Sequence, residues 1–81
     1  MQALFTERFS RSFVDAPPDI QKRFGQTLAH LLRSRSHPSL YAKKYDEADD
    51  LWQARVTDDW RFFFRIEGNI YKLMDITPHP K

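Results

Sequence analysis

The sequence predicts an α+β fold, in which two helices cover one face of an antiparallel sheet. Two observations lead to this prediction. Apolar residues recur with a helical period in the first half of the chain, and they alternate with a period of two in the second half. The 81 residues are enough for a single domain, residues 1–81, whose core draws on seven phenylalanines, three tyrosines and two tryptophans.

The first half is predicted to contain a short strand, residues 2–5, and a helical hairpin. Thr6 is placed to cap a helix of about ten residues, in which Phe9 and Phe13 lie one turn apart on the same face. An Ala-Pro-Pro sequence ends this helix, because proline interrupts a helix but fits the first turn of the next one. The second helix, residues 18–33, carries one apolar stripe made of Ile20, Phe24, Leu28, Leu31 and Leu32.

The second half is predicted to form three strands joined by two hairpin turns. Residues 51–57 and 60–66 alternate in polarity, with Asp58-Asp59 as the turn between them. Gly68-Asn69 tolerates positive φ and forms the next turn, before a last strand at residues 70–76 whose register the pattern leaves open. The exposed face of the first two strands carries Arg55, Arg61 and Arg65. Like charges on one face repel each other unless an anion binds among them.

Charge and composition exclude several classes of protein. The net charge of +2 divides into +5 over residues 1–45 and −3 over residues 46–81, so the total charge alone does not indicate nucleic acid. An ordinary solvated surface explains it equally well. Cysteine is absent, no apolar run approaches the roughly 18–20 residues of a membrane span, and the N-terminus lacks a signal-peptide pattern. The sequence therefore predicts a cytoplasmic protein with no membrane partner.

The sequence also predicts no metal site and no cofactor. Its three histidines are widely spaced and have no cysteine near them, which disfavours zinc. Glycine occurs only at positions 25 and 68, so a phosphate-binding glycine loop is lacking. The acidic residues between 46 and 50 do not follow the EF-hand pattern, and a solvated loop is the simpler interpretation.

Arginine and lysine remain as candidates for chemistry. They can cleave RNA when the 2′-hydroxyl of the substrate is the nucleophile, because the protein then has to align that hydroxyl, neutralise the phosphorane-like charge and move two protons. Arginine suits charge stabilisation, since its planar fork binds two phosphate oxygens. A lysine crowded by other cations would have a lowered pKa and act as a base. The competing interpretation is that Arg55 and Arg61 pair with Asp58, Asp59 or Asp75 across the sheet.

A series of short motifs runs through essentially the whole chain. In order they are His37-Pro38-Ser39-Leu40, Lys43-Lys44-Tyr45, Leu51-Trp52, Arg55-Val56, Trp60-Arg61-Phe62, Ile70-Tyr71 and Ile76-Thr77-Pro78-His79. Each motif is weak by itself. Their order and spacing together resemble the RelE/ParE superfamily of bacterial toxins, in the RelE-like branch with an HPSL loop.

This resemblance implies the toxin of a type II toxin–antitoxin system, an endoribonuclease that cleaves mRNA in the ribosomal A site and leaves a 2′,3′-cyclic phosphate. It implies that Arg55 and Arg61 contact the scissile phosphate and that His79 is the general acid. The expected RNA-binding residues are Lys43, Lys44, Arg65 and Lys81. Gln53 stands where some members of the family have a catalytic lysine.

Two further functions stay open. ParE-like members inhibit DNA gyrase and cut no RNA, so that Arg55 and Arg61 would serve structure. A catalytically degenerate binding protein is the other alternative, because active members commonly carry an aromatic residue after the tail histidine and Lys81 is the last residue here. Three residues can replace that aromatic group only if they reach the site: Tyr41, Tyr45 and Tyr71. Both a RelE-like endoribonuclease and a ParE-like gyrase inhibitor would have a cognate antitoxin. An extended or helical segment of that antitoxin is expected to cover the helical hairpin and the basic face.

Overall fold

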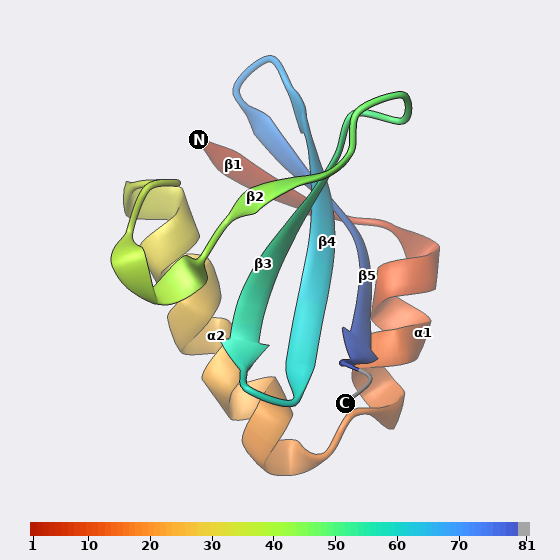
Figure 1. Ribbon diagram of the computed structural model, residues 1–81. Coiled ribbons are helices and arrows are strands. Elements are labelled where there is room, and N and C mark those ends of the chain that lie inside the picture. Colours follow the sequence, from red (N-terminus) through yellow and green to blue (C-terminus); the bar gives the residue numbers. More distant parts are fainter. Residues whose placement is uncertain (80–81) are drawn as a thin grey trace.

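Five strands form one mixed sheet with two helices on one face, in the computed structural model, which describes residues 1–79 (Figure 1). The elements in chain order are β1 (Gln2–Phe5), α1 (Glu7–Asp15), α2 (Pro18–Arg33), the 3₁₀ turn η1 (Pro38–Leu40), β2 (Lys43–Asp46), β3 (Leu51–Thr57), β4 (Trp60–Glu67) and β5 (Ile70–Pro78). The predicted fold class is confirmed. No helix within residues 1–79 is long and apolar enough to cross a membrane.

The sheet has the order β1-β5-β4-β3-β2. β1 pairs with β5 in parallel, and the other neighbours are antiparallel. The register of β5, which the sequence left open, places Phe62 opposite Ile76 and Phe63 opposite Asp75. Sequence periodicity did not predict β2, because its residues, KKYD, show no apolar alternation. Charged residues are typical of an edge strand, where they discourage pairing with other chains.

Thr6 joins the first helix to the sheet. Its hydroxyl oxygen accepts a hydrogen bond from the amide of Phe9 at 3.2 Å, which makes it the N-cap of α1 as predicted. The same hydroxyl donates to the carbonyl of Leu73 in β5 at 2.7 Å. One side chain therefore satisfies the start of α1 and fixes its position against β5.

The core lies between the helices and the sheet and is built around phenylalanine. The ring of Phe24 in α2 lies 5.1 Å from that of Phe9 in α1 and 5.3 Å from that of Phe62 in β4, measured between centroids. The predicted apolar stripe of α2 faces this core: Ile20, Phe24 and Leu31 are buried, and Leu28 and Leu32 pack against them. The helical period was therefore interpreted correctly.

Phe62 is fully buried at the centre of this core, so we expect Phe62→Ala to destabilise the protein by about 3–5 kcal/mol. The loss combines the transfer free energy of the ring with the cavity that it leaves. Urea unfolding followed by circular dichroism measures it, with Tyr45→Ala as the control because that ring is largely exposed. Equal unfolding midpoints for the two variants would contradict this description of the core.

Candidate functional site: a cationic hollow on the open sheet face

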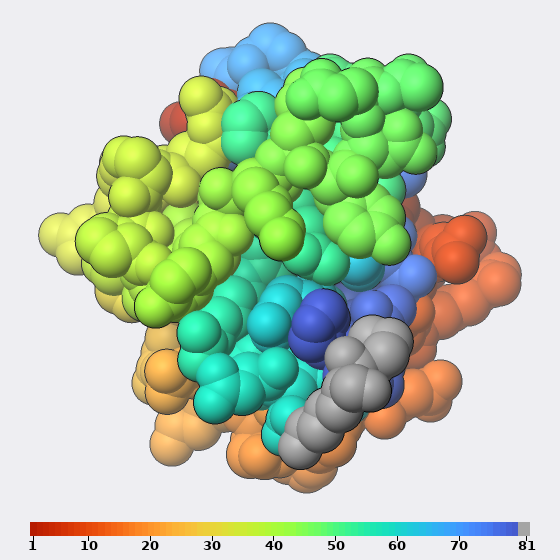
Figure 2. Space-filling view, in the orientation of Figure 1, coloured from red at the N-terminus to blue at the C-terminus, as the bar shows by residue number. Residues whose placement is uncertain are grey.

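The sheet face opposite the helices carries the polar side chains of β3 and β4. Arg55 lies opposite Arg61, and Gln53 lies opposite Phe63, in the antiparallel register of these strands. Two adjoining hollows lie on this face, with volumes of about 410 and 430 Å³. They are found between the segment that includes β2 and the end of β5 (Figure 2). Their lining residues are Tyr41, Ala42, Lys43, Tyr45, Gln53, Arg55, Arg61, Phe63, Thr77, Pro78 and His79. We call the two together the cationic hollow.

Arg61 is held by the turn that connects β3 to β4. Its Nη1 donates to the carbonyl oxygens of Thr57 at 2.5 Å, Trp60 at 3.0 Å and Asp58 at 3.2 Å. Burial, followed by the positive charge of Arg55, lowers the pKa of the Arg61 guanidinium, although Asp59 acts in the opposite direction. Two adjacent guanidinium groups, one fixed by main-chain carbonyls, form a preorganised position for an anion such as a phosphodiester.

Arg55 has two partners at the rim of the hollow. Its guanidinium forms an ion pair with Asp58, and its Cζ lies 5.0 Å from the ring centroid of Tyr41. This pairing with Asp58 was predicted from the sequence as the alternative to a role of Arg55 in phosphate binding. The side chain of Asp58 is 82% exposed, however, and ion pairs of this kind contribute only about 0–1 kcal/mol. A phosphate that enters the hollow can therefore replace this carboxylate at little cost.

Tyr41 takes its position from the 3₁₀ turn. Leu40 is fully buried in the core, and the next residue turns outward with φ 48° and ψ 40°. A tyrosine in this left-handed conformation costs of the order of 1–3 kcal/mol. The ring is 66% exposed and covers Arg55. The surrounding structure thus maintains a strained backbone that presents an aromatic ring at the rim of the hollow.

His79 reaches the hollow from the end of β5. Its main-chain amide donates to the carbonyl of Asp59 at 2.6 Å, so the tail is attached to the β3–β4 turn that also holds Arg61. The residue lines both parts of the hollow together with Gln53 and Arg61. The structure therefore brings together all three predicted catalytic residues and one predicted RNA-binding residue, Lys43.

Lys44 lies elsewhere. It pairs with Trp52 in the β2–β3 register, its Nζ is 5.1 Å from the Trp52 ring centroid, and it forms an ion pair with Asp50. The hydrogen bond to Asp50 raises the pKa of the Lys44 ammonium. This direction is opposite to the lowered pKa that a lysine base among cations would have. The expected role of Lys44 in RNA binding stays a prediction.

Arg65 and Lys81 are also not part of the hollow as described. Arg65 forms an ion pair with Asp49 at 3.0 Å, in a neighbouring hollow of about 280 Å³ that also contains Arg8 and Asp75. Tyr45 and Phe63 line both this hollow and the cationic hollow. The two carboxylates in the neighbouring hollow each form an ion pair with one of its two arginines, so these four side chains add no net positive charge that would attract a nucleic-acid backbone. Lys81 lies outside the described residues.

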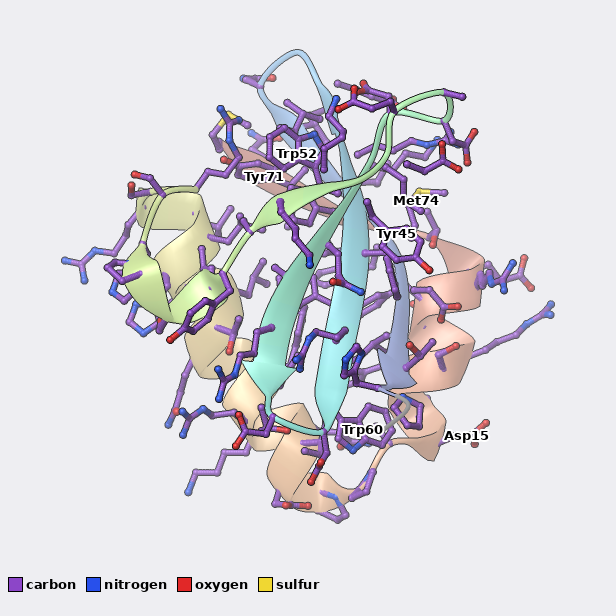
Figure 3. The ribbon with its side chains drawn as sticks, viewed as in Figure 1. Asp15, Tyr45, Trp52, Trp60, Tyr71 and Met74 are labelled. Atoms are coloured by element: carbon purple, nitrogen blue, oxygen red, sulfur yellow. The ribbon has the colours of Figure 1, made fainter. Side chains whose placement is uncertain are left out.

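The sequence alone did not show which polar and aromatic side chains lie around Arg55 and Arg61. Tyr41 and Tyr45 line the hollow, whereas Tyr71 is buried in the core against Phe64. Tyr45 and Tyr71 are labelled in Figure 3. Tyr45 projects from β2 across the sheet and meets Phe63 edge-on, with 5.1 Å between ring centroids. The signal that was available is the Lys43-x-Tyr45 spacing, which places both side chains on one face once β2 is a strand.

Comparison with known proteins gives a result at the level of structure only. No family model and no curated protein sequence matches the chain. A YoeB/ParE toxin from Agrobacterium tumefaciens matches with a TM-score of 0.81 and 13% identity, over 99% of this chain and 100% of that one. The archaeal RelE of a RelE–RelB complex from Pyrococcus horikoshii OT3 matches with a TM-score of 0.78 and 16% identity, over 95% and 92%. The RelBE2 complex from Mycobacterium tuberculosis contains a chain that matches with a TM-score of 0.75 and 20% identity, over 96% of each.

The three matches agree with the fold that the resemblance implied. The likeness extends over nearly the whole of each chain, so it is not confined to one hairpin or one helix pair. The chain has the fold of the RelE/ParE toxin superfamily.

Proposed function

We propose that this chain is the toxin of a type II toxin–antitoxin system and that it cleaves mRNA on the ribosome. The cationic hollow is the observation that carries the proposal. It gathers Lys43, Arg55, Arg61 and His79 around exposed aromatic rings, and no carboxylate is among its described lining residues. Cations interleaved with aromatic groups bind a phosphodiester backbone and stack bases.

In the proposed reaction the 2′-hydroxyl oxygen attacks the adjacent phosphorus, the bond from phosphorus to the 5′ oxygen breaks, and a 2′,3′-cyclic phosphate forms. Arg61 and Arg55 stabilise the additional negative charge on the phosphoryl oxygens. His79 donates a proton to the departing 5′ oxygen. The proton of the 2′-hydroxyl passes to water in the open hollow. Arg55 acts as a phosphate ligand here, since a guanidinium is not deprotonated in proteins.

The ribosome enters the proposal because the hollow is open and has no carboxylate base among its described lining residues. An open, shallow site holds a flexible single strand poorly in an in-line geometry. The ribosomal A site supplies an mRNA whose conformation is already restricted, which removes part of that entropic cost.

Mapping new RNA ends after a short induction of the chain in bacterial cells tests the function. We expect primer extension to show new 5′ ends that follow the reading frame, and only within translated regions. Arrested growth with no new ends would replace the proposal by gyrase inhibition, which a DNA supercoiling assay then measures. Normal growth with no new ends would indicate a catalytically degenerate binding protein.

We further propose that a cognate antitoxin covers the apolar groove formed by β1, α1 and α2. This groove has a volume of about 410 Å³, and its lining includes Phe5, Phe9, Phe13, Val14, Phe24 and Leu28. Matching structures include a RelB–RelE complex from Methanococcus jannaschii and a YoeB–YefM complex from Staphylococcus aureus. An amphipathic antitoxin helix fits such a groove, and its connecting segment extends over the cationic hollow.

Val14 is 73% exposed at the edge of this groove, so we expect Val14→Asp to weaken antitoxin binding at least about tenfold without unfolding the toxin. The new carboxylate would lose its water in an apolar contact. Ala29→Asp, at an exposed position of α2 outside the groove lining, is the matched control. Calorimetric titration with the product of the neighbouring gene measures both. Equal affinities for the two variants would exclude the groove as the docking site.

A further inference from the structure

Gln53 is a buried polar side chain at the floor of the cationic hollow. The residue is only 8% exposed, and it lines both parts of the hollow together with Arg61 and His79. Within residues 1–79 its amide group has no hydrogen-bond partner in another side chain or in the main chain. An amide carries both a donor and an acceptor. Neither amide atom of Gln53 is among the fully buried polar atoms that lack a partner within residues 1–79. This group is therefore available to whatever fills the hollow.

An aromatic surface lies directly beside this amide. Gln53 is the cross-strand partner of Phe63 on one side and of Lys43 on the other. Tyr45 meets the ring of Phe63 edge-on at 5.1 Å and is 59% exposed, so much of its surface is open to solvent and available for stacking. A flat ring that stacks on Tyr45 has its edge within reach of position 53, because neighbouring strands lie only about 5 Å apart.

We propose that Tyr45, Phe63 and Gln53 form a nucleobase subsite next to the phosphate position, in which the Gln53 amide binds the edge of an adenine. The inference rests on the proposed function and makes its substrate more specific. Tyr45 and Phe63 supply stacking, which every base accepts, and the amide supplies the choice among bases. Glutamine pairs with adenine through one donated and one accepted hydrogen bond, at N7 and at the N6 amino group.

The charges around position 53 favour a base over a second phosphate at this point. Lys43, Arg55 and Arg61 already surround the hollow with cations, and the neutral amide adds no attraction for another phosphate. A base held on Tyr45 leaves its 3′ phosphate free to extend toward Arg61, since both residues line the same part of the hollow. The adenine is thus the nucleotide on the 5′ side of the bond that breaks.

Binding of short RNA to the isolated chain tests the subsite separately from cleavage. The probes are four fluorescent pentanucleotides, UUNUU, with N as A, C, G or U and a 2′-deoxyribose at N, so that no 2′-hydroxyl is available for attack. Fluorescence anisotropy gives the four dissociation constants. We expect the A probe to bind about tenfold more tightly than the C and U probes, a ratio equivalent to about 1.4 kcal/mol.

Three variants separate the contributions. Gln53→Ala is expected to bring the four dissociation constants within about threefold of one another and to weaken mainly the A probe. Tyr45→Leu is expected to weaken all four by roughly tenfold, because stacking does not discriminate among bases. Gln26→Ala, the same change at an exposed position of α2, leaves all four unchanged. Circular dichroism melting confirms that each variant is folded.

Two results would overturn the inference in different ways. Equal binding of the four probes by the unmodified chain, with no change in Gln53→Ala, would remove the adenine subsite and leave the proposed RNA cleavage intact. Failure of the unmodified chain to bind any probe, even at millimolar concentration, would also overturn the nucleobase subsite, whereas the proposed function is decided separately by the RNA ends mapped in cells, where the ribosome presents the mRNA.

Discussion

Replacing Arg61 by alanine is expected to lower the rate of mRNA cleavage by about 10²–10³-fold and to abolish growth arrest. The guanidinium is the most constrained group of the cationic hollow, since three main-chain carbonyls hold its Nη1. It is therefore in place before the substrate arrives, and its charge acts on the transition state without reorganisation. Removing such a group usually costs the chemical step more than it costs binding.

The same hydrogen bonds make Arg61 a structural residue as well, so the experiment has to separate the two roles. Arg61→Lys keeps the positive charge but loses the planar fork, and we expect it to remain folded and to recover only a small part of the activity. Arg11→Ala is the matched control, because Arg11 is an exposed arginine of α1 that pairs with Glu7. Cleavage is measured by primer extension, and folding by thermal melting under the same conditions.

A folded Arg61→Ala variant that still produces in-frame ends at the original rate would show that Arg61 serves only the β3–β4 turn. An Arg61→Ala variant that melts far below the unmodified chain would move the test to Arg61→Lys. In that variant, full activity would contradict the proposed bidentate contact with phosphate.

The sequence predicted most of this structure because its local signals agree with the tertiary packing. Phe24 and its neighbours repeat with the period of a helix, and Phe62 and Phe64 repeat with the period of a strand, so hydrophobic patterning alone separates the two layers. The HPSL segment is also held locally, since the ring of His37 accepts a hydrogen bond from the amide of Ser39 and thereby caps the turn. Each of these signals involves residues that are close in sequence.

The errors concern features that only long-range pairing decides. β2 is specified by its pairing with β3 and not by its own apolar pattern, so hydrophobic periodicity did not predict it. Without that strand, Lys43 and Lys44 look equivalent. With it, the alternation of side chains sends Lys43 into the cationic hollow and Lys44 to Trp52 on the other face. Without that strand, sequence reasoning therefore did not distinguish Lys43 from Lys44 and did not bring Tyr45 to the hollow that Gln53 lines. RNA binding by Lys44 stays a prediction.

Arg65 shows a different limit. Its face was predicted correctly, because β4 alternates regularly between Arg61 and Arg65. Four residues of strand separate the two by roughly 13 Å, however. At that distance the acidic segment after β2 supplies Asp49 as a closer partner for Arg65. Two arginines on the same sheet face therefore need not belong to the same site. For Arg65, the position of Asp49 in the loop after β2 decides which group it pairs with.

His79→Gln is expected to slow cleavage by about 10²–10⁴-fold while the protein stays folded, since the side chain is proposed to protonate the departing 5′ oxygen. The fold should tolerate the change, because the hydrogen bond that anchors the tail comes from the main-chain amide of His79 to Asp59 and is independent of the side chain. His30→Gln is the matched control. His30 stacks on His37 with 4.0 Å between ring centroids, at the end of α2 and outside the hollow.

A change of leaving group separates proton donation from a merely structural role of His79. In an mRNA whose scissile 5′ oxygen is replaced by sulfur, the leaving thiolate is far less basic than an alkoxide and needs no proton. On ribosomes that carry this mRNA, we expect His79→Gln to cleave within about tenfold of the unmodified chain, because the acid then contributes little. Arg61→Ala should stay impaired on the same mRNA, since charge on the phosphoryl oxygens still develops. An equal loss for His79→Gln on both substrates would assign the histidine to positioning of the tail, and the general acid would have to be sought elsewhere.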